Sequence, residues 1–167
     1  MARLQVLTYP DPRLREPSLP VKVFDEALAG LAADLLETMY AEPAIGLSAP
    51  QVDVRSRLLV MDVSERKNRP EVFVNPEVLS SARQGWIEER CMSVPGRSGL
   101  VRRATEVRVR ASTLEGESFE RRLSGLAAVC LLHELDHLDG RLFVDRLSWL
   151  GRLRFRAALA MQARCAA

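Results

Sequence analysis

Two kinds of residue that carry metal and redox chemistry are scarce in this sequence of 167 residues. Histidine occurs twice and cysteine three times, and three cysteines are far too few for a disulfide scaffold. No stretch approaches the ~18 uninterrupted apolar residues that cross a membrane, and the first residues lack the apolar run of a signal peptide. These absences predict a cytoplasmic protein that has no membrane partner.

An excess of charge of one sign is also lacking. The 24 basic and 22 acidic side chains leave a net charge of +2, which argues against a protein that coats nucleic acid, so we expect no DNA partner. Hydrophobic residues make up 47% of the chain, as in soluble globular proteins, and the length suffices to bury one core. We therefore predict a single domain that covers residues 1–167.

Hydrophobic periodicity predicts an α+β fold. Asp25 is the expected N-cap of the first helix, Ser124 is that of the second, and Gly140 marks the point where the second helix stops. The expected elements are an extended arm (1–23), helices (24–42, 124–140 and 147–167), strands (56–63, 71–79 and 105–113) and a loop (45–52).

The two histidines lie four residues apart, in the segment LLHELDHLDG (131–140), and a glutamate directly follows the first. Positions i and i+4 of a helix share one face, so His133 and His137 can bind one metal ion with Glu134 beside it. A catalytic metal site needs a third protein ligand and keeps one position for water. The sequence has no third histidine and no acidic side chain after Asp145, so we expect the third ligand upstream.

A cysteine thiolate is the strongest upstream candidate, because it binds borderline-soft divalent ions at neutral pH. Cys130 precedes the first histidine by three residues, so its side chain would lie beside the ion rather than on it. Cys165 lies in the tail. A single cysteine is usually a buried small apolar residue, but the missing ligand favours Cys91, in the segment EERCMSVPG (88–96), as the third donor.

Three segments resemble, in order and in spacing, the signature segments of peptide deformylases. IGLSAPQ (45–51), ERCMSVPG (89–96) and HELDH (133–137) correspond to G-Φ-G-L-A-A-x-Q, E-G-C-L-S and H-E-x-D-H of that family. The opening VLTYPDPRLREPSLPV (6–21) also resembles the family's N-terminal arm. The resemblance implies an α+β fold in which antiparallel sheets pack around a central helix that carries the HExxH metal motif, with an N-terminal helix and a C-terminal helix.

The resemblance implies a metal-dependent hydrolase that removes the N-formyl group from the N-terminal formyl-methionine of newly made polypeptides and releases formate. It implies one divalent metal ion per chain, expected to be Fe²⁺ in the cell, whereas purified protein can carry Zn²⁺, Ni²⁺ or Co²⁺. Glu134 would take a proton from water, whose pKa falls to roughly 7 on a catalytic metal. The implied site residues are the ligands Cys91, His133 and His137, the oxyanion donors Gln51 (side chain) and Met92 (backbone N–H), and the Gly46 backbone, which binds the substrate.

Methionine specificity requires an apolar pocket beside the metal. Leu126, Val129 and Cys130 precede His133 by seven, four and three residues, so they extend the metal-facing side of the helix toward its N-terminus. In most helices such a stripe belongs to the core. Because this stripe ends at the metal, we expect it to line the methionine pocket, with Ile45 as a neighbour.

Asp136, between the two histidines, has two possible roles. It could hydrogen-bond a ligand imidazole from behind and so orient it. It could equally pair with a nearby arginine such as Arg103. The sequence leaves both interpretations open.

Two positions depart from the family pattern. Arg90 occupies the place of a glycine before the ligand cysteine, and Ala44 replaces the first glycine of the first motif. An arginine in the left-handed region would be strained, and its charge would alter the cleft. A metal-retaining peptide-binding protein with low or altered activity is therefore an alternative, as is a hydrolase of another formyl or acyl amide. The presence of Glu134 favours an active deformylase, because binding alone needs no base.

The tail, residues 146–167, carries five arginines and no acidic side chain. Leu150, Leu153, Ala157 and Met161 form only a thin apolar stripe, so the basic side is expected to face solvent. Taken alone, such a tail is simply a solvated helix. Members of the family that this sequence resembles can dock on the ribosome through a C-terminal helix. Ribosome docking through residues 146–167 is therefore the second interpretation.

Overall fold

The computed structural model describes the backbone of residues 3–165 and the side chains up to residue 161. Within that range the strands form one five-stranded antiparallel sheet in the order β1-β2-β3-β4-β5. The expected antiparallel sheets are thus a single continuous sheet. Its strands are β1 (Gly46–Ser48), β2 (Leu58–Met61), β3 (Glu71–Arg90), β4 (Ser98–Ser112) and β5 (Ser118–Ser124).

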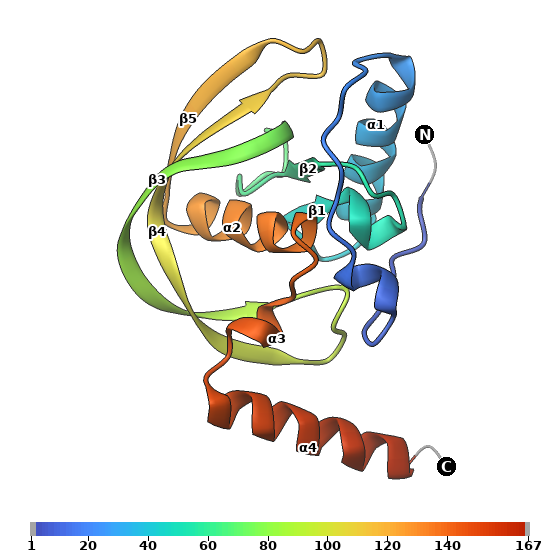
Figure 1. Cartoon of the computed structure of the whole chain (residues 1–167), viewed down its shortest axis with the longest axis vertical. Coiled ribbons are helices and arrows are strands. Elements are labelled where there is room, and N and C mark those ends of the chain that lie inside the picture. The colour runs from blue at the N-terminus through green and yellow to red at the C-terminus, as the bar shows by residue number, and fades with distance from the viewer. Residues whose placement is uncertain (1–2, 166–167) are drawn as a thin grey trace.

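The described residues also form four α-helices. The long strands β3 and β4 bend around α2, while α1 lies against β1 and β2 (Figure 1). The last helix, α4, lies at the lower end of the molecule, beyond α3 (Figure 1). No helix in residues 3–165 is both long and apolar enough to cross a membrane. The helices are α1 (Glu26–Ala41), α2 (Leu126–Leu138), α3 (Phe143–Arg146) and α4 (Trp149–Cys165).

Packing against the sheet fixes the helix that carries both histidines. Leu131 and Leu138 of α2 are fully buried, in one core cluster with Phe73 of β3 and Val109 of β4. Burial of one large apolar side chain contributes about 1.5–3 kcal/mol. Several such side chains therefore hold α2 in place, and with it every side chain that α2 presents to the site.

The ends of the first two helices agree only in part with the sequence signals. Asp25 caps α1 as predicted, because its carboxylate accepts a hydrogen bond from the Leu28 N–H at 3.0 Å. The predicted cap Ser124 is wrong: it is the last residue of β5, and Gly125 takes the cap position with a φ of 57°. Glycine adopts this backbone freely, so a tight turn replaces the side-chain cap. Gly140, at a φ of 69°, follows the C-cap of α2 as predicted.

The predicted arm is extended from residue 3 onward apart from a 3-10 turn at Pro12–Arg15, and residues 1 and 2 lie outside the described range. Its backbone ties three later segments of the chain together. The N–H groups of Leu7, Tyr9 and Ser18 donate to the carbonyl oxygens of Gln51, Ser93 and Leu138 at 2.7, 2.7 and 2.8 Å.

Several elements differ from the predicted pattern. The predicted loop over 45–52 contains β1 and a 3-10 turn at Ala49–Val52, and β5 and α3 are elements that the periodicity does not indicate. The predicted strand over 71–79 continues to Arg90. Its second half is mostly exposed on both faces, so the hydrogen-bond ladder with β4 holds it, and an apolar face does not.

Candidate metal centre

The three predicted ligands converge from two elements. Cys91 directly follows β3, and His133 and His137 lie on α2. Their ligand atoms all lie within 4.8 Å of one another, and Cys91 Sγ is 3.2 Å from His137 Nε2. One ion at about 2.0–2.3 Å from each donor can therefore contact all three. A thiolate with two imidazoles suits a borderline-soft divalent ion, so the residues present fit such a group.

Glu89 orients the first histidine. Its Oε2 lies 2.8 Å from His133 Nδ1, which leaves Nε2 as the nitrogen free to bind metal. Burial by itself raises the pKa of Glu89, but hydrogen bonds from Arg103 and His133 outweigh it and lower the pKa to about 2. The carboxylate therefore stays ionised and favours the proton on His133 Nδ1. Sequence reasoning missed this role, although Glu89 stands in the cysteine motif.

Asp136 pairs with arginines and touches neither imidazole. Arg103, which is 4% exposed, places one guanidinium between Glu89 and Asp136, with Nε 2.6 Å from Glu89 Oε1 and Nη1 2.6 Å from Asp136 Oδ2. Arg146 adds a bond from Nε to Asp136 Oδ2 at 3.0 Å. Loss of one partner from a buried ion network costs about 3–5 kcal/mol. Of the two open interpretations, the pairing with Arg103 is the one found, and it fixes Glu89 behind His133.

Glu134 is buried beside the predicted ligands. Its Oε2 lies 2.9 Å from the Ser48 hydroxyl, and burial raises the pKa of the carboxyl group. The backbone of β1 approaches so closely that a Cβ on Gly46 would lie 2.7 Å from Glu134 Oε1 and 2.8 Å from Cys130 Sγ. Glycine is therefore required at position 46, because any side chain would displace this carboxylate.

The amide of Gln51 is oriented by its neighbours. Its Oε1 accepts a hydrogen bond from the Ser48 N–H at 2.9 Å, so the amino group faces the other way. That amino group, Nε2, lies 3.2 Å from Ser93 Oγ and 3.7 Å from Cys91 Sγ. An N–H donor thus points to the metal cluster. Sequence reasoning missed the roles of Ser48 and Ser93, because a serine gives no signal of its hydrogen-bond partner.

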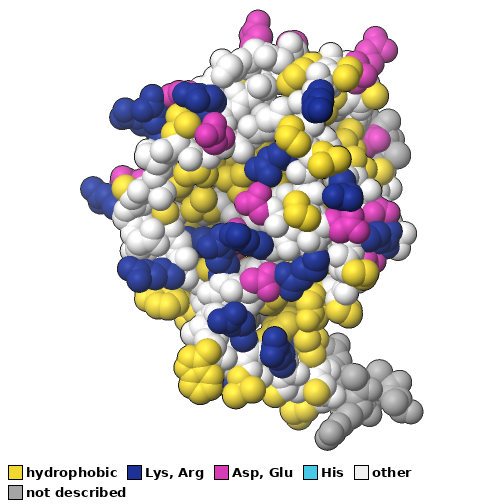
Figure 2. Space-filling model, viewed as in Figure 1, with side chains coloured by type: hydrophobic (Ala, Val, Ile, Leu, Met, Phe, Trp, Pro, Cys, Tyr) yellow, Lys and Arg dark blue, Asp and Glu magenta, His cyan; other side chains and the backbone are white. Residues whose placement is uncertain are grey.

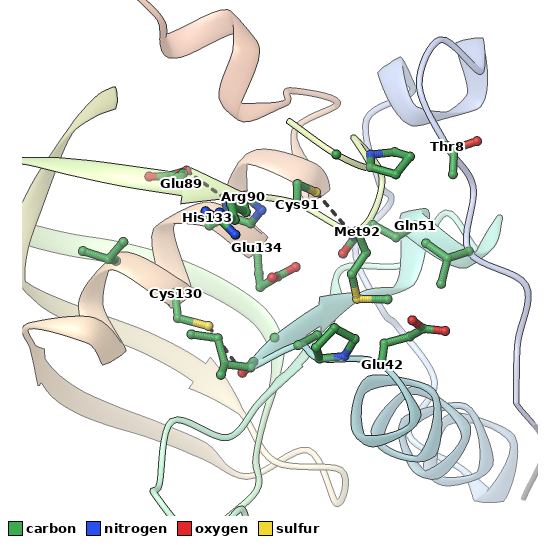
Figure 3. A pocket seen from close by; sticks show the side chains of 18 of the residues that line it. Thr8, Glu42, Gln51, Glu89, Arg90, Cys91, Met92, Cys130, His133 and Glu134 are labelled. Atoms are coloured by element: carbon green, nitrogen blue, oxygen red, sulfur yellow. Dashed lines mark hydrogen bonds and ion pairs between the residues drawn. The ribbon is translucent and has the colours of Figure 1, made fainter. Parts of the chain in front are cut away.

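One cavity of about 950 Å³ brings the remaining predicted residues together. Gln51, Met92, His133 and Glu134 surround one part of it, and the side chains point into a shared space (Figure 3). The four residues predicted to bind methionine also line it, namely Ile45, Leu126, Val129 and Cys130.

Cys130 belongs to the cavity wall. It is absent from the cluster of Cys91 and the two histidines, and its Sγ donates a hydrogen bond to the Ile45 carbonyl at 3.5 Å. Burial raises the pKa of the Cys130 thiol well above its usual value, and the nearby carboxylates act in the same direction. The thiol therefore stays protonated, which suits a wall residue and disfavours a metal ligand.

The two departures from the family pattern cause no backbone strain. Arg90 ends β3 opposite Ser98, and neither Arg90 nor Ala44 is among the described residues with positive φ. The expectation of strain is therefore wrong, because a regular strand position needs no glycine. The expected charge in the cleft is found, since the exposed Arg90 side chain lines the cavity.

Comparison with known proteins gives one consistent result. Residues 3–152 match the family described as Polypeptide deformylase. The chain is 50% identical to a peptide deformylase of Hahella chejuensis over 163 residues, which cover 97% of each sequence. A crystal structure of a peptide deformylase from Legionella pneumophila superposes with a TM-score of 0.90 at 44% identity, over 99% of this chain and 98% of that one. The peptide deformylase of Ehrlichia chaffeensis in complex with actinonin gives a TM-score of 0.90 at 32% identity, over 98% and 99% of the two chains.

Proposed function

This chain belongs to the polypeptide deformylase family, and on that premise we propose a catalytic or binding role for each residue of the site. The activity is hydrolysis of the N-formyl group on the N-terminal formyl-methionine of newly made polypeptides, with release of formate. The convergence of one thiol and two imidazoles beside a buried carboxylate is the observation that carries the proposal.

Cys91, His133 and His137 hold one divalent metal ion, and we expect Fe²⁺ in the cell. When bound, such an ion polarises the formyl carbonyl and lowers the pKa of a coordinated water to about 7. Purified protein can carry Zn²⁺, Ni²⁺ or Co²⁺, because the same donor set accepts these ions. Support for the ligand set comes from the 4.8 Å cluster and from Glu89, which orients His133.

Glu134 takes the proton of the attacking water and delivers it to the leaving amine. Its burial and its single close partner, the Ser48 hydroxyl, leave the carboxylate available to a proton. The Gln51 amino group and the Met92 backbone N–H stabilise the oxyanion, which calls for donors fixed in advance. Hydrogen bonds with Ser48 and Ser93 orient the Gln51 side chain and supply that fixation for one of the donors.

The peptide binds as an extended strand with its methionine in the apolar part of the cavity. In the described sheet β1 pairs only with β2, so the other edge of β1 at Gly46 is free for backbone hydrogen bonds. Ile45, Leu126, Val129 and Cys130 form the methionine pocket. We further propose that residues 1–167 act as one domain in the cytoplasm, where formylated nascent peptides are made.

Activity should depend on metal. The purified protein should hydrolyse formyl-Met-Ala-Ser, a chelator should abolish the activity, and Fe²⁺ added without oxygen should restore it best. Air should inactivate the iron form, because both the thiolate and the ion are oxidised. The measurement is formate release per metal ion. Full activity of the chelated protein would overturn the metal mechanism, and turnover only of non-peptide formamides would indicate a different hydrolase.

The C-terminal helix is proposed to dock on the ribosome. Arg152, Arg154 and Arg156 are exposed, whereas Arg146 is bound to Asp136 and does not belong to the free basic surface. Side chains from residue 162 onward, including the predicted Arg164, and residues 166–167 lie outside the described range.

The apolar stripe of α4 faces solvent. Phe155 is buried against the body, while Leu150, Leu153 and Met161 are 41%, 56% and 69% exposed. Figure 2 shows hydrophobic side chains gathered at the lower end of the molecule, with Lys and Arg side chains just above them. A helix that is only solvated does not require exposed apolar side chains. The exposed arginines and exposed apolar side chains of α4 together form a surface that suits a partner.

Binding to ribosomes should weaken steeply with salt, because a cationic helix displaces counterions from RNA phosphate. The measurement is co-sedimentation at low and high salt. The test variant replaces Arg152, Arg154, Arg156 and Arg164 with glutamine. The matched control replaces Arg66, Arg102, Arg121 and Arg122, which are exposed elsewhere on the surface. If both variants and the parent pellet equally with ribosomes and turnover is intact, the tail is a solvated helix with no role in ribosome binding.

A further inference from the structure

Arg90 stands in the wall of the substrate cavity, directly before the ligand Cys91. Its side chain is exposed, and Figure 3 shows it among the side chains that line the cavity. A guanidinium is charged at every relevant pH and presents several N–H donors to a carboxylate. Position 90 therefore puts a permanent cation in the wall of the substrate cavity, one residue before the proposed ligand Cys91.

The other charged groups of this wall are already engaged. Arg3 forms an ion pair with Glu42, and Glu89 is held by Arg103 and His133. Among the described residues that line the cavity, Arg90 is the charged side chain for which the structure shows neither an ion pair nor a side-chain hydrogen bond. It is thus available to a charge on the substrate.

Glu88 is the nearest competitor for Arg90. It lies two residues earlier on β3, so both side chains project from the same face of the strand. The Glu88 carboxylate accepts a hydrogen bond from Ser98 Oγ at 2.7 Å, and no ion pair joins it to Arg90 in the described structure. Glu88 can reduce the field of Arg90 but does not occupy its donors.

We propose that Arg90 is a specificity residue that favours formyl-methionyl peptides with a carboxylate at the second or third residue. The inference rests on the proposed function, which places the formyl group at the metal. The Cα atoms of Arg90 and the proposed ligand Cys91 are about 3.8 Å apart, because the two residues are consecutive. An extended peptide advances ~3.3 Å per residue, so the two residues after methionine remain within reach of the guanidinium.

The experiment compares isosteric peptides that carry a C-terminal amide, so that only a side chain supplies the carboxylate. The pairs are formyl-Met-Asp-Ser-amide with its Asn analogue, and formyl-Met-Ala-Asp-amide with its Asn analogue. We expect kcat/KM for Asp to exceed that for Asn by about two- to fivefold in one pair, as for an exposed ion pair. The ratio should fall toward one at high salt, because screening weakens exposed charges.

Substitutions assign the effect to one side chain. Arg90→Gln should bring the Asp/Asn ratio to one, Arg90→Lys should keep part of it, and Glu88→Gln should increase it. Arg102→Gln is the matched control, since Arg102 is exposed on β4 and does not line the cavity. A ratio of one in the parent protein, or a preference that survives Arg90→Gln, would overturn the inference while leaving the proposed function intact. If no peptide is turned over, the proposed function fails instead. In that case the ratio of the Kd values for the Asn and Asp peptides, measured by calorimetry, still decides the role of Arg90.

Discussion

Replacement of Glu134 by glutamine should remove almost all turnover while the protein keeps one metal ion per chain. The substitution takes away no metal ligand and preserves the shape of a side chain that is only 4% exposed. A glutamine cannot accept the proton of water and return it to the amine. General acid–base catalysis contributes typically 10²–10⁴-fold, so we expect kcat to fall by about that factor.

The measurement pairs kcat on formyl-Met-Ala-Ser with metal content from elemental analysis. Glu37→Gln is the matched control, because Glu37 is exposed on α1 and does not line the cavity. It makes the same chemical change outside the site. A variant at Glu134 that kept kcat within a few-fold of the parent would assign the proton transfer to another group.

Cys91→Ala and Cys130→Ala should separate the ligand from the pocket wall. Cys91→Ala should lose both the metal and the activity, because a catalytic site needs three protein ligands and the described residues supply no fourth donor to the cluster. Cys130→Ala should keep the metal and raise KM for methionine peptides by about tenfold, the effect of one methylene-sized gap in a binding pocket. Elemental analysis and KM on formyl-Met-Ala-Ser give the two readouts.

These two variants are matched controls for each other, since each removes one buried thiol. Loss of metal from Cys130→Ala together with its retention in Cys91→Ala would reverse the ligand assignment. Loss of metal from both would show that the cavity wall is needed to shape the site.

The parts of the site that could be predicted lie within short segments. The spacing of His133 and His137 places them on one face of a helix whatever the rest of the chain does. Cys91 followed by elimination among the three cysteines, because Cys130 precedes His133 on the same helix and Cys165 lies in the tail. Glu89 could not be found in this way. A carboxylate that is 5% exposed persists only because Arg103, from the neighbouring strand, neutralises it, and no local pattern reveals that pairing.

The fold was predictable where one face of an element is apolar, as in the helix that begins after Asp25. It was not predictable for the second half of β3 or for β5, where exposed polar side chains alternate with few buried ones. Those strands exist because the backbone of β4 lies between them and pairs with both. Backbone hydrogen bonds between strands place few constraints on which side chains follow one another. Hydrophobic periodicity therefore predicts an end of β3 that is too early.

The arm that joins Gln51, Ser93 and Leu138 can complete its hydrogen bonds only after residue 138 has been synthesised. Ribosomes add roughly 5–20 residues per second, so the arm is synthesised many seconds before its last partner on α2. Contacts so distant along the chain form late in folding. The same delay applies to the metal, whose proposed ligands are complete only at His137. A copy whose synthesis has not passed His137 therefore lacks a complete set of the proposed ligands.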